Sequence, residues 1–202
     1  MKRYFFISLV MVLFLPGWIA LSTADTGSPR GKSAGAGLLP DELKSMKVED
    51  YFVESKTTPV GSIQSTTRYV VVVHKDTNRA YFAVTGDAVY EQDHFYTLKD
   101  SRCRVKFSNE DIITMGENSK IIVDEIVNDQ AAQKKSSVIS MLKGKAMFYV
   151  VRLFKHKTVN ASVKTPTAVM GVRGTKFGVD VRKAGEKIAD LSDDSFIYLA
   201  QN

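Results

Sequence analysis

Residues 102–107, Arg-Cys-Arg-Val-Lys-Phe, alternate strictly between basic and apolar side chains. Successive side chains of an extended strand point to opposite faces of its sheet. The apolar residues therefore share one face, and Arg102, Arg104 and Lys106 share the other. This pattern predicts a half-buried β-strand with a basic outer face.

Similar short runs of strand-forming residues lie on both sides of this segment, and clusters of turn residues separate them. Tyr69–His74 precedes it, and Ile121–Val123 and Ala146–Leu153 follow it. Turn signals that recur about every ten residues are typical of an all-β sandwich or roll. We therefore expect an all-β fold, a compact sandwich or roll of short, mostly antiparallel strands. Asp129–Ser137 holds good helix formers, but it is too short and polar to organise a core.

The first 24 residues differ from the rest of the chain. A basic Met1-Lys2-Arg3 precedes an apolar run from Tyr4 to Leu15, and Ser22 and Ala24 are small residues at the −3 and −1 positions of a cleavage site. These features predict a secretory signal peptide over residues 1–24, cut before Asp25. The alternative is an uncleaved membrane anchor, for which the apolar run is short. The expected location is therefore exported, in the periplasm or cell envelope.

Residues 25–45 are expected to form a flexible linker, because residues 25–37 are small, polar and rich in glycine. Within this linker, Pro40–Lys44 could begin one helical turn. Residues 46–202 are expected to form a single β-domain, either cut short at its C-terminus or open at a sheet edge.

The formal charge of +6 falls to +4 once Lys2 and Arg3 leave with the signal peptide. A basic cytosolic protein would suggest nucleic acid as a partner, but the export signal excludes that interpretation. Anionic envelope polymers and acidic protein surfaces remain as partners. The single cysteine excludes an intrachain disulfide, so the core alone must hold the fold.

Residues 163–179, Val-Lys-Thr-Pro-Thr-Ala-Val-Met-Gly-Val-Arg-Gly-Thr-Lys-Phe-Gly-Val, form the most specific motif of the chain. The stretch resembles the TP-x-A-V-x-GVRGT-x-F pattern of the FecR domain family. The residues that match this pattern are Thr165, Pro166, Gly171, Val172, Arg173, Gly174, Thr175 and Phe177.

Other short segments match the same family in order, from about Gly61 to Val179. They are Gly86-Asp87 with Asp93 and Thr97, the polar turn at Asp100-Ser101, Met115–Ser119 and Leu142–Lys145. The resemblance implies an envelope protein that binds and signals without catalysis. Family members that handle a sigma factor carry a cytoplasmic segment before their membrane span. Only Met1-Lys2-Arg3 precedes the apolar run here, so we do not extend the anti-sigma role to this chain.

Arg173 has two interpretations. If the strand after Thr165 continues without interruption, Arg173 shares a face with Phe177 and Val179 and points into the core. A buried guanidinium must be paired, and Asp87 and Asp93 are the natural partners. Alternatively, a bulge at a flanking glycine turns Arg173 outward to bind a carboxylate of a partner protein.

The row Arg102, Arg104 and Lys106 also has two interpretations. Such a row is usually the solvated face of an amphipathic strand, and it discourages edge pairing. Alternatively, it holds an anionic glycan, assisted by exposed tyrosines such as Tyr90 and Tyr96. This second interpretation makes the protein a glycan- or cell-wall-binding module.

The sequence offers no pattern for catalysis, a metal or a cofactor. Cys103 falls on the apolar face of its strand, and His74, His94 and His156 lie in separate segments without ligand spacing. We therefore expect a non-enzymatic envelope protein that binds another envelope protein through sheet edges and turns, in signal relay or assembly. Any contact with the membrane would be made through an uncleaved signal segment.

Overall fold

The computed structural model describes residues 37–151, 157–172, 176–183 and 196–201. The regular structure of these residues consists of β-strands and short 3-10 turns such as η2 (Asp41–Leu43), so the expected all-β fold is confirmed. The strands are β1 (Val48–Glu49), β2 (Gly61–Thr67), β3 (Val70–His74), β4 (Arg79–Phe82), β5 (Ala88–Val89), β6 (His94–Thr97), β7 (Arg102–Phe107), β8 (Ile112–Met115), β9 (Lys120–Asp129), β10 (Lys134–Tyr149), β11 (Thr158–Lys164), β12 (Val169–Val172), β13 (Lys176–Lys183) and β14 (Phe196–Gln201).

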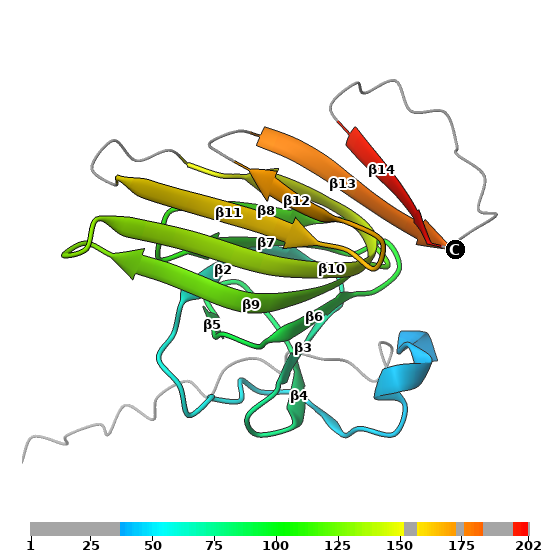
Figure 1. Ribbon diagram of the computed structural model, residues 1–202. Coiled ribbons are helices and arrows are strands. Elements are labelled where there is room, and N and C mark those ends of the chain that lie inside the picture. The colour runs from blue at the N-terminus through cyan, green and yellow to red at the C-terminus, as the bar shows by residue number, and fades with distance from the viewer. Residues whose placement is uncertain (1–36, 152–156, 173–175, 184–195, 202) are drawn as a thin grey trace, which may run out of the picture.

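The strands form two sheets that share β10 (Figure 1). Sheet A has the order β1-β4-β3-β6-β9-β10-β11-β12, and sheet B has the order β14-β13-β10-β8-β7-β2-β5. The first part of β10, to Lys143, pairs with β9, whereas Gly144–Tyr149 pairs with β13. Most pairs are antiparallel, as expected; the parallel ones are β1 with β4, β10 with β11, and β13 with β14.

Strand β10 bends sharply where it passes from sheet A to sheet B. A straight strand of its length would span about 50 Å. Instead, Lys135 near its start donates from Nζ to the carbonyl of Val151, just beyond its end, over 2.6 Å. The bend lies at Gly144, whose φ of 91° falls in the left-handed region that favours glycine. A Cβ at this position would lie only 2.5 Å from the Cα of Ser119, so the close approach also requires glycine.

A hydrogen-bonded junction holds this bend, and the motif residues Thr97, Gly116, Ser119 and Gly144 form it. The hydroxyl of Thr97 donates to the carbonyl of Gly116 (2.5 Å) and accepts from the Ser119 amide (2.9 Å). The Ser119 hydroxyl in turn accepts from the Lys145 amide (3.0 Å). These short segments, which are apart in the sequence, therefore meet at the corner between the two sheets.

The main core lies between the two sheets and contains the inward-facing residues of both. In β7, Cys103, Val105 and Phe107 are buried and the residues between them face outward, as the alternation predicts. Sheet A contributes Val72, Phe95, Ile121, Ile139 and Val163, and sheet B also contributes Ile113, Ala146, Phe148, Phe177 and Val179. The arrangement is that of the expected sandwich or roll.

A second, smaller core lies on the outer side of sheet A. There Leu43, which is 1% exposed, packs with Val71, Val73, Phe82 and Tyr96. Both faces of β3 are consequently buried. The range expected for a flexible linker, 25–45, thus ends in a packed segment, while its residues up to 36 lie outside the described part of the chain.

The helix considered for Asp129–Ser137 is wrong. These residues end β9, turn at Gln130–Gln133 and begin β10. Lys135, Ser136 and Ser137 are buried there against the loop before β8, and this packing outweighs the helix propensity of the segment.

Candidate functional site

The motif residues Thr165 and Pro166 form the turn of a hairpin between β11 and β12. The amide of Thr165 donates to the carbonyl of Ala168 (2.8 Å), and the Thr165 hydroxyl accepts from the Ala168 amide (3.1 Å). Pro166 suits the turn because it supplies no amide hydrogen and has a fixed φ. The next motif residues, Gly171 and Val172, lie on β12 itself.

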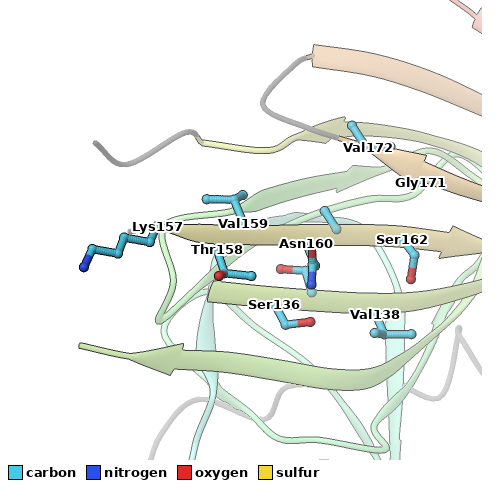
Figure 2. Close-up of a pocket in the computed structure, with 11 residues that line it drawn as sticks. Ser136, Val138, Lys157, Thr158, Val159, Asn160, Ser162, Gly171 and Val172 are labelled. Atoms are coloured by element: carbon cyan, nitrogen blue, oxygen red, sulfur yellow. The ribbon is translucent and has the colours of Figure 1, made fainter. Parts of the chain in front are cut away.

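A shallow groove of about 550 Å³ runs over β10, β11 and β12 on the outer side of sheet A (Figure 2). Its floor consists of cross-strand neighbours with small side chains. Val138 lies beside Ser162, and Ser162 lies beside Gly171; Ser136 lies beside Asn160. Because these side chains are short, a partner could approach the backbone of this sheet closely.

The groove opens onto a free sheet edge. Within the described ranges, β12 pairs with β11 and with no other strand. The hydrogen bond from the Thr165 amide to the Ala168 carbonyl makes these two residues a hydrogen-bonded pair of the antiparallel hairpin. Hydrogen-bonded and non-hydrogen-bonded pairs alternate along such a hairpin, so every second residue of β12 bonds to β11. By this alternation the amides and carbonyls of Val169 and Gly171 point away from β11. Val169 is also 70% exposed, so this edge is accessible.

The inward interpretation of Arg173 is conditional on one uninterrupted strand from Thr165 to Val179, and the described residues instead form two strands. β12 ends at Val172 and pairs within sheet A, whereas β13 begins at Lys176 and pairs with β10 and β14 in sheet B. Val169 is therefore exposed, although Phe177 and Val179 are buried in the core. Arg173, Gly174 and Thr175 lie outside the described residues, so the two interpretations of Arg173 both stay predictions.

Asp87 and Asp93 were proposed as partners of Arg173. In the described residues, Asp93 pairs with His74. Its carboxylate lies 2.6 Å from Nδ1 of His74 and accepts a hydrogen bond from the Tyr90 amide (2.8 Å). Asp87 is buried, and its carboxylate accepts from the amide of Val84 (2.9 Å) within the Thr85–Asp87 turn.

The His74–Asp93 pair is fully buried, and Nε2 of His74 lies 2.6 Å from the carbonyl of Val53. Both ring nitrogens therefore face acceptors when Asp93 is ionised, and the imidazolium form then satisfies both while the neutral ring satisfies one. Burial raises the pKa of Asp93, and the hydrogen bond from His74 acts against that shift. Burial alone would lower the pKa of His74. The hydrogen bond and charge of Asp93, together with the Val53 carbonyl, outweigh burial and raise that pKa above its usual value.

A second buried polar cluster joins the loop before β8 to both ends of β10, and no motif in the sequence predicted it. Nζ of Lys135, a residue with 0% exposure, donates to Asp111 Oδ1 over 2.5 Å. Asp111 also accepts from the Ser137 hydroxyl (2.5 Å) and the Val151 amide (2.9 Å). Asn109 donates to the Ser137 hydroxyl (2.7 Å) and completes the cluster.

The basic residues of β7 lie on the outer face of sheet B. Arg104 donates from Nε to the side-chain oxygen of Gln64 (2.9 Å), and Lys106 forms an ion pair with Glu110 (2.6 Å). Arg102 is exposed and borders a polar hollow that Asp100 and Glu117 also line.

The tyrosines expected beside this face are not exposed. Tyr90 is 2% and Tyr96 7% exposed, because Tyr90 packs edge-on against the ring of His74 and Tyr96 packs in the second core. The exposed aromatic residue on this face is instead Tyr149, which is 48% exposed and lies beside Ile112 in the register.

Cys103 is fully buried, and burial raises the pKa of its thiol to about 12. Such a thiol is a poor nucleophile at neutral pH. Among the described residues, no three His, Cys, Asp or Glu side chains gather in a way that could hold a metal ion.

Comparison with protein families assigns the chain to a family. The model of the family described as FecR protein matches residues 93–202, which is more than half of the chain. The chain belongs to the FecR family. The resemblance seen in the sequence is thus confirmed. A search of curated proteins and a search of solved structures each found no match.

The FecR match begins at Asp93 and includes the corner of β10, the motif hairpin and the edge strand β12. FecR is not a family of enzymes; its members are typically associated with the cell envelope, and membership suggests a signalling-related role. None of the helical segments in the part of the chain that the structure describes has the length and apolar character needed to cross a bilayer.

Proposed function

We propose that this FecR-family protein is an exported, non-enzymatic binding module of the cell envelope. It captures an extended segment of another envelope protein along the free edge of β12, in signal relay or assembly. The observation that carries the proposal is the accessible edge at Val169 and Gly171, which lies inside the family motif.

Strand addition fits the chemistry of this edge. An incoming strand gains main-chain hydrogen bonds from the outward amides and carbonyls of β12, and shallow depressions beside the edge select its side chains. The groove over Ser162 and Gly171 provides such a depression next to β12 (Figure 2). The edge is short and ends in the Thr165–Ala168 turn, which limits uncontrolled pairing with other chains.

Export is supported by the signal-peptide features of residues 1–24 and by the envelope association of the FecR family. In this proposal the mature chain begins at Asp25. The segment that follows joins the new N-terminus to the β-domain.

Cross-linking in the native envelope tests the proposal. A photoreactive residue replaces Val169 on the free edge, and in a matched control it replaces Thr67, which is exposed at the end of β2 in the other sheet. We expect one discrete protein adduct from position 169 and no such adduct from position 67. The adduct should persist in high salt, because main-chain hydrogen bonds between strands depend little on ionic strength.

Two outcomes would contradict the proposal. One is equal labelling from both positions, which would indicate random encounter. The other is an absence of any protein adduct at position 169 when the protein is exported at its normal level.

A further inference from the structure

Charged and apolar side chains from four strands meet on the outer face of sheet B. The register places Lys106, Ile112, Tyr149 and Lys176 in one row across β7, β8, β10 and β13. The neighbouring row holds Arg104, Thr114, Met147 and Gly178. Residues paired in this way project from the same side of the sheet, about 4.8 Å apart from strand to strand.

The charge of this face is predominantly positive. Arg102, Arg104, Lys106, Lys145 and Lys176 lie on it, and all of them are exposed or partly exposed. Glu110 pairs with Lys106, and Lys145 lies 3.9 Å from Asp180. Among the described residues, no carboxylate forms an ion pair with Arg102 or Arg104. Nε of Arg104 donates to the neutral side chain of Gln64, and Arg102 borders the hollow that Asp100 and Glu117 also line. The remaining donors of Arg104 face an anionic ligand, and guanidinium recognises carboxylates in a bidentate way.

The centre of the face is an apolar strip whose side chains, apart from Tyr149, project little from the sheet. Tyr149 is about half exposed, Ile112 and Met147 are partly buried, and Gly178 beside Met147 has no side chain. A tyrosine ring has an apolar face and a polar hydroxyl, which suits a ligand that is apolar on one side and hydroxylated around its rim. Sugar rings have this character, and a chain of them can lie flat across several strands.

We infer that the outer face of sheet B binds an anionic polysaccharide, with Tyr149 beneath a sugar ring and the basic residues on its acidic groups. This surface is separate from the β12 edge, which belongs to the other sheet. A uronic-acid polymer is the appropriate probe, because it combines sugar rings with carboxylates.

The test measures binding of polygalacturonate to the purified protein, with its fully methyl-esterified, uncharged form as the ligand control. We expect binding of the charged polymer alone, weakened at least tenfold between 50 and 500 mM salt, on the order expected for several released counterions. Arg104→Gln should weaken it roughly fivefold to tenfold. Lys134→Gln removes the same charge at the far end of β10 in sheet A, and it should change the affinity less than about twofold.

Tyr149→Ala distinguishes sugar recognition from charge alone. We expect it to weaken polygalacturonate binding by about tenfold and to leave the binding of inorganic polyphosphate unchanged, since polyphosphate has no ring to stack. Its thermal unfolding midpoint should match that of the wild type. Equal loss for both polymers, no loss for either, or binding of the esterified polymer with the same affinity would each overturn the inference.

The polygalacturonate measurement is independent of the proposal that β12 captures a partner strand. Failure of polygalacturonate to bind leaves the cross-linking at Val169 unaffected, and the absence of an adduct at Val169 leaves the polysaccharide measurement unaffected.

Discussion

Two buried ion pairs hold different parts of this fold. The His74–Asp93 pair joins β3 to the turn before β6 and fastens the segment at Val53 to them. The Lys135–Asp111 pair joins the loop before β8 to both ends of the bent strand β10. Both are inaccessible to solvent, yet they differ in what they hold.

The two buried pairs stabilise the β-sandwich in different ways. Lys135 and Asp111 bring together segments that are remote in sequence, and this requires β10 to turn at Gly144. His74 instead fastens one segment against a sheet that the rest of the core already forms. We therefore expect the first pair to be needed for the fold as a whole and the second to tune its stability.

Breaking the Lys135–Asp111 pair should have the largest effect. Lys135→Met leaves the Asp111 carboxylate buried without its cation, and loss of one partner of a buried pair costs about 3–5 kcal/mol. Denaturant unfolding followed by circular dichroism measures this change. The double variant Lys135→Met with Asp111→Asn should lose less than the sum of the two single variants. Additive losses would show that the pair does not act as a unit.

The bend at Gly144 gives the next largest effect. Gly144→Ala places a Cβ against the backbone of Ser119 at a φ of 91°, so the corner must either strain or open. We expect a loss of about 2–4 kcal/mol in the free energy of unfolding. Gly171→Ala is the matched control, because a Cβ there meets no atom within 4 Å and the residue has no positive φ. A similar loss in both variants would contradict the role of the bend.

The His74–Asp93 pair should make stability depend on pH. Because the pKa of His74 is raised in the folded state, its contribution is complete below the unfolded pKa of about 6.5 and is lost as pH rises through the folded pKa. The loss amounts to about 1.4 kcal/mol for each pH unit that separates the two pKa values.

Urea unfolding between pH 6 and pH 9 measures this dependence. His74→Gln, which does not titrate in this range, should be less stable at pH 6 and should show a flatter profile. A wild-type profile that is flat, or that rises with pH, would show that His74 is neutral in the folded protein.

The strands and their buried faces were largely predictable from the sequence. The alternation of residues 102–107 identified the core face of β7, and the turn clusters separated most of the strands. These features depend on neighbouring residues, which the sequence displays directly.

Features that depend on distant contacts were not predictable. Helix formers at 131–135 gave no indication that Lys135 would meet Asp111, so a short helix was considered where β10 begins. Tyr90 is buried by its contact with the ring of His74, and Tyr96 is buried by the N-terminal segment that contains Leu43. Both contacts join residues that are distant in the sequence. The break between β12 and β13 follows from pairing in two different sheets.

A substitution at the β12 edge should change stability least, because neither buried ion pair involves a residue of β12. Val169→Pro removes an amide that points away from β11, so the free energy of unfolding should change by less than about 1 kcal/mol. Val169→Thr keeps that amide and is the matched control. Denaturant unfolding of both variants measures this change, and a large loss in Val169→Pro alone would place its amide in the sheet.

The same pair of variants tests the capture of a partner strand most directly. A photoreactive residue at Thr167, exposed in the adjoining turn, reports contact with the partner in the native envelope. The account predicts that the discrete protein adduct is retained in Val169→Thr and lost in Val169→Pro, while both proteins stay folded. An adduct of equal yield in both variants would contradict strand addition at β12.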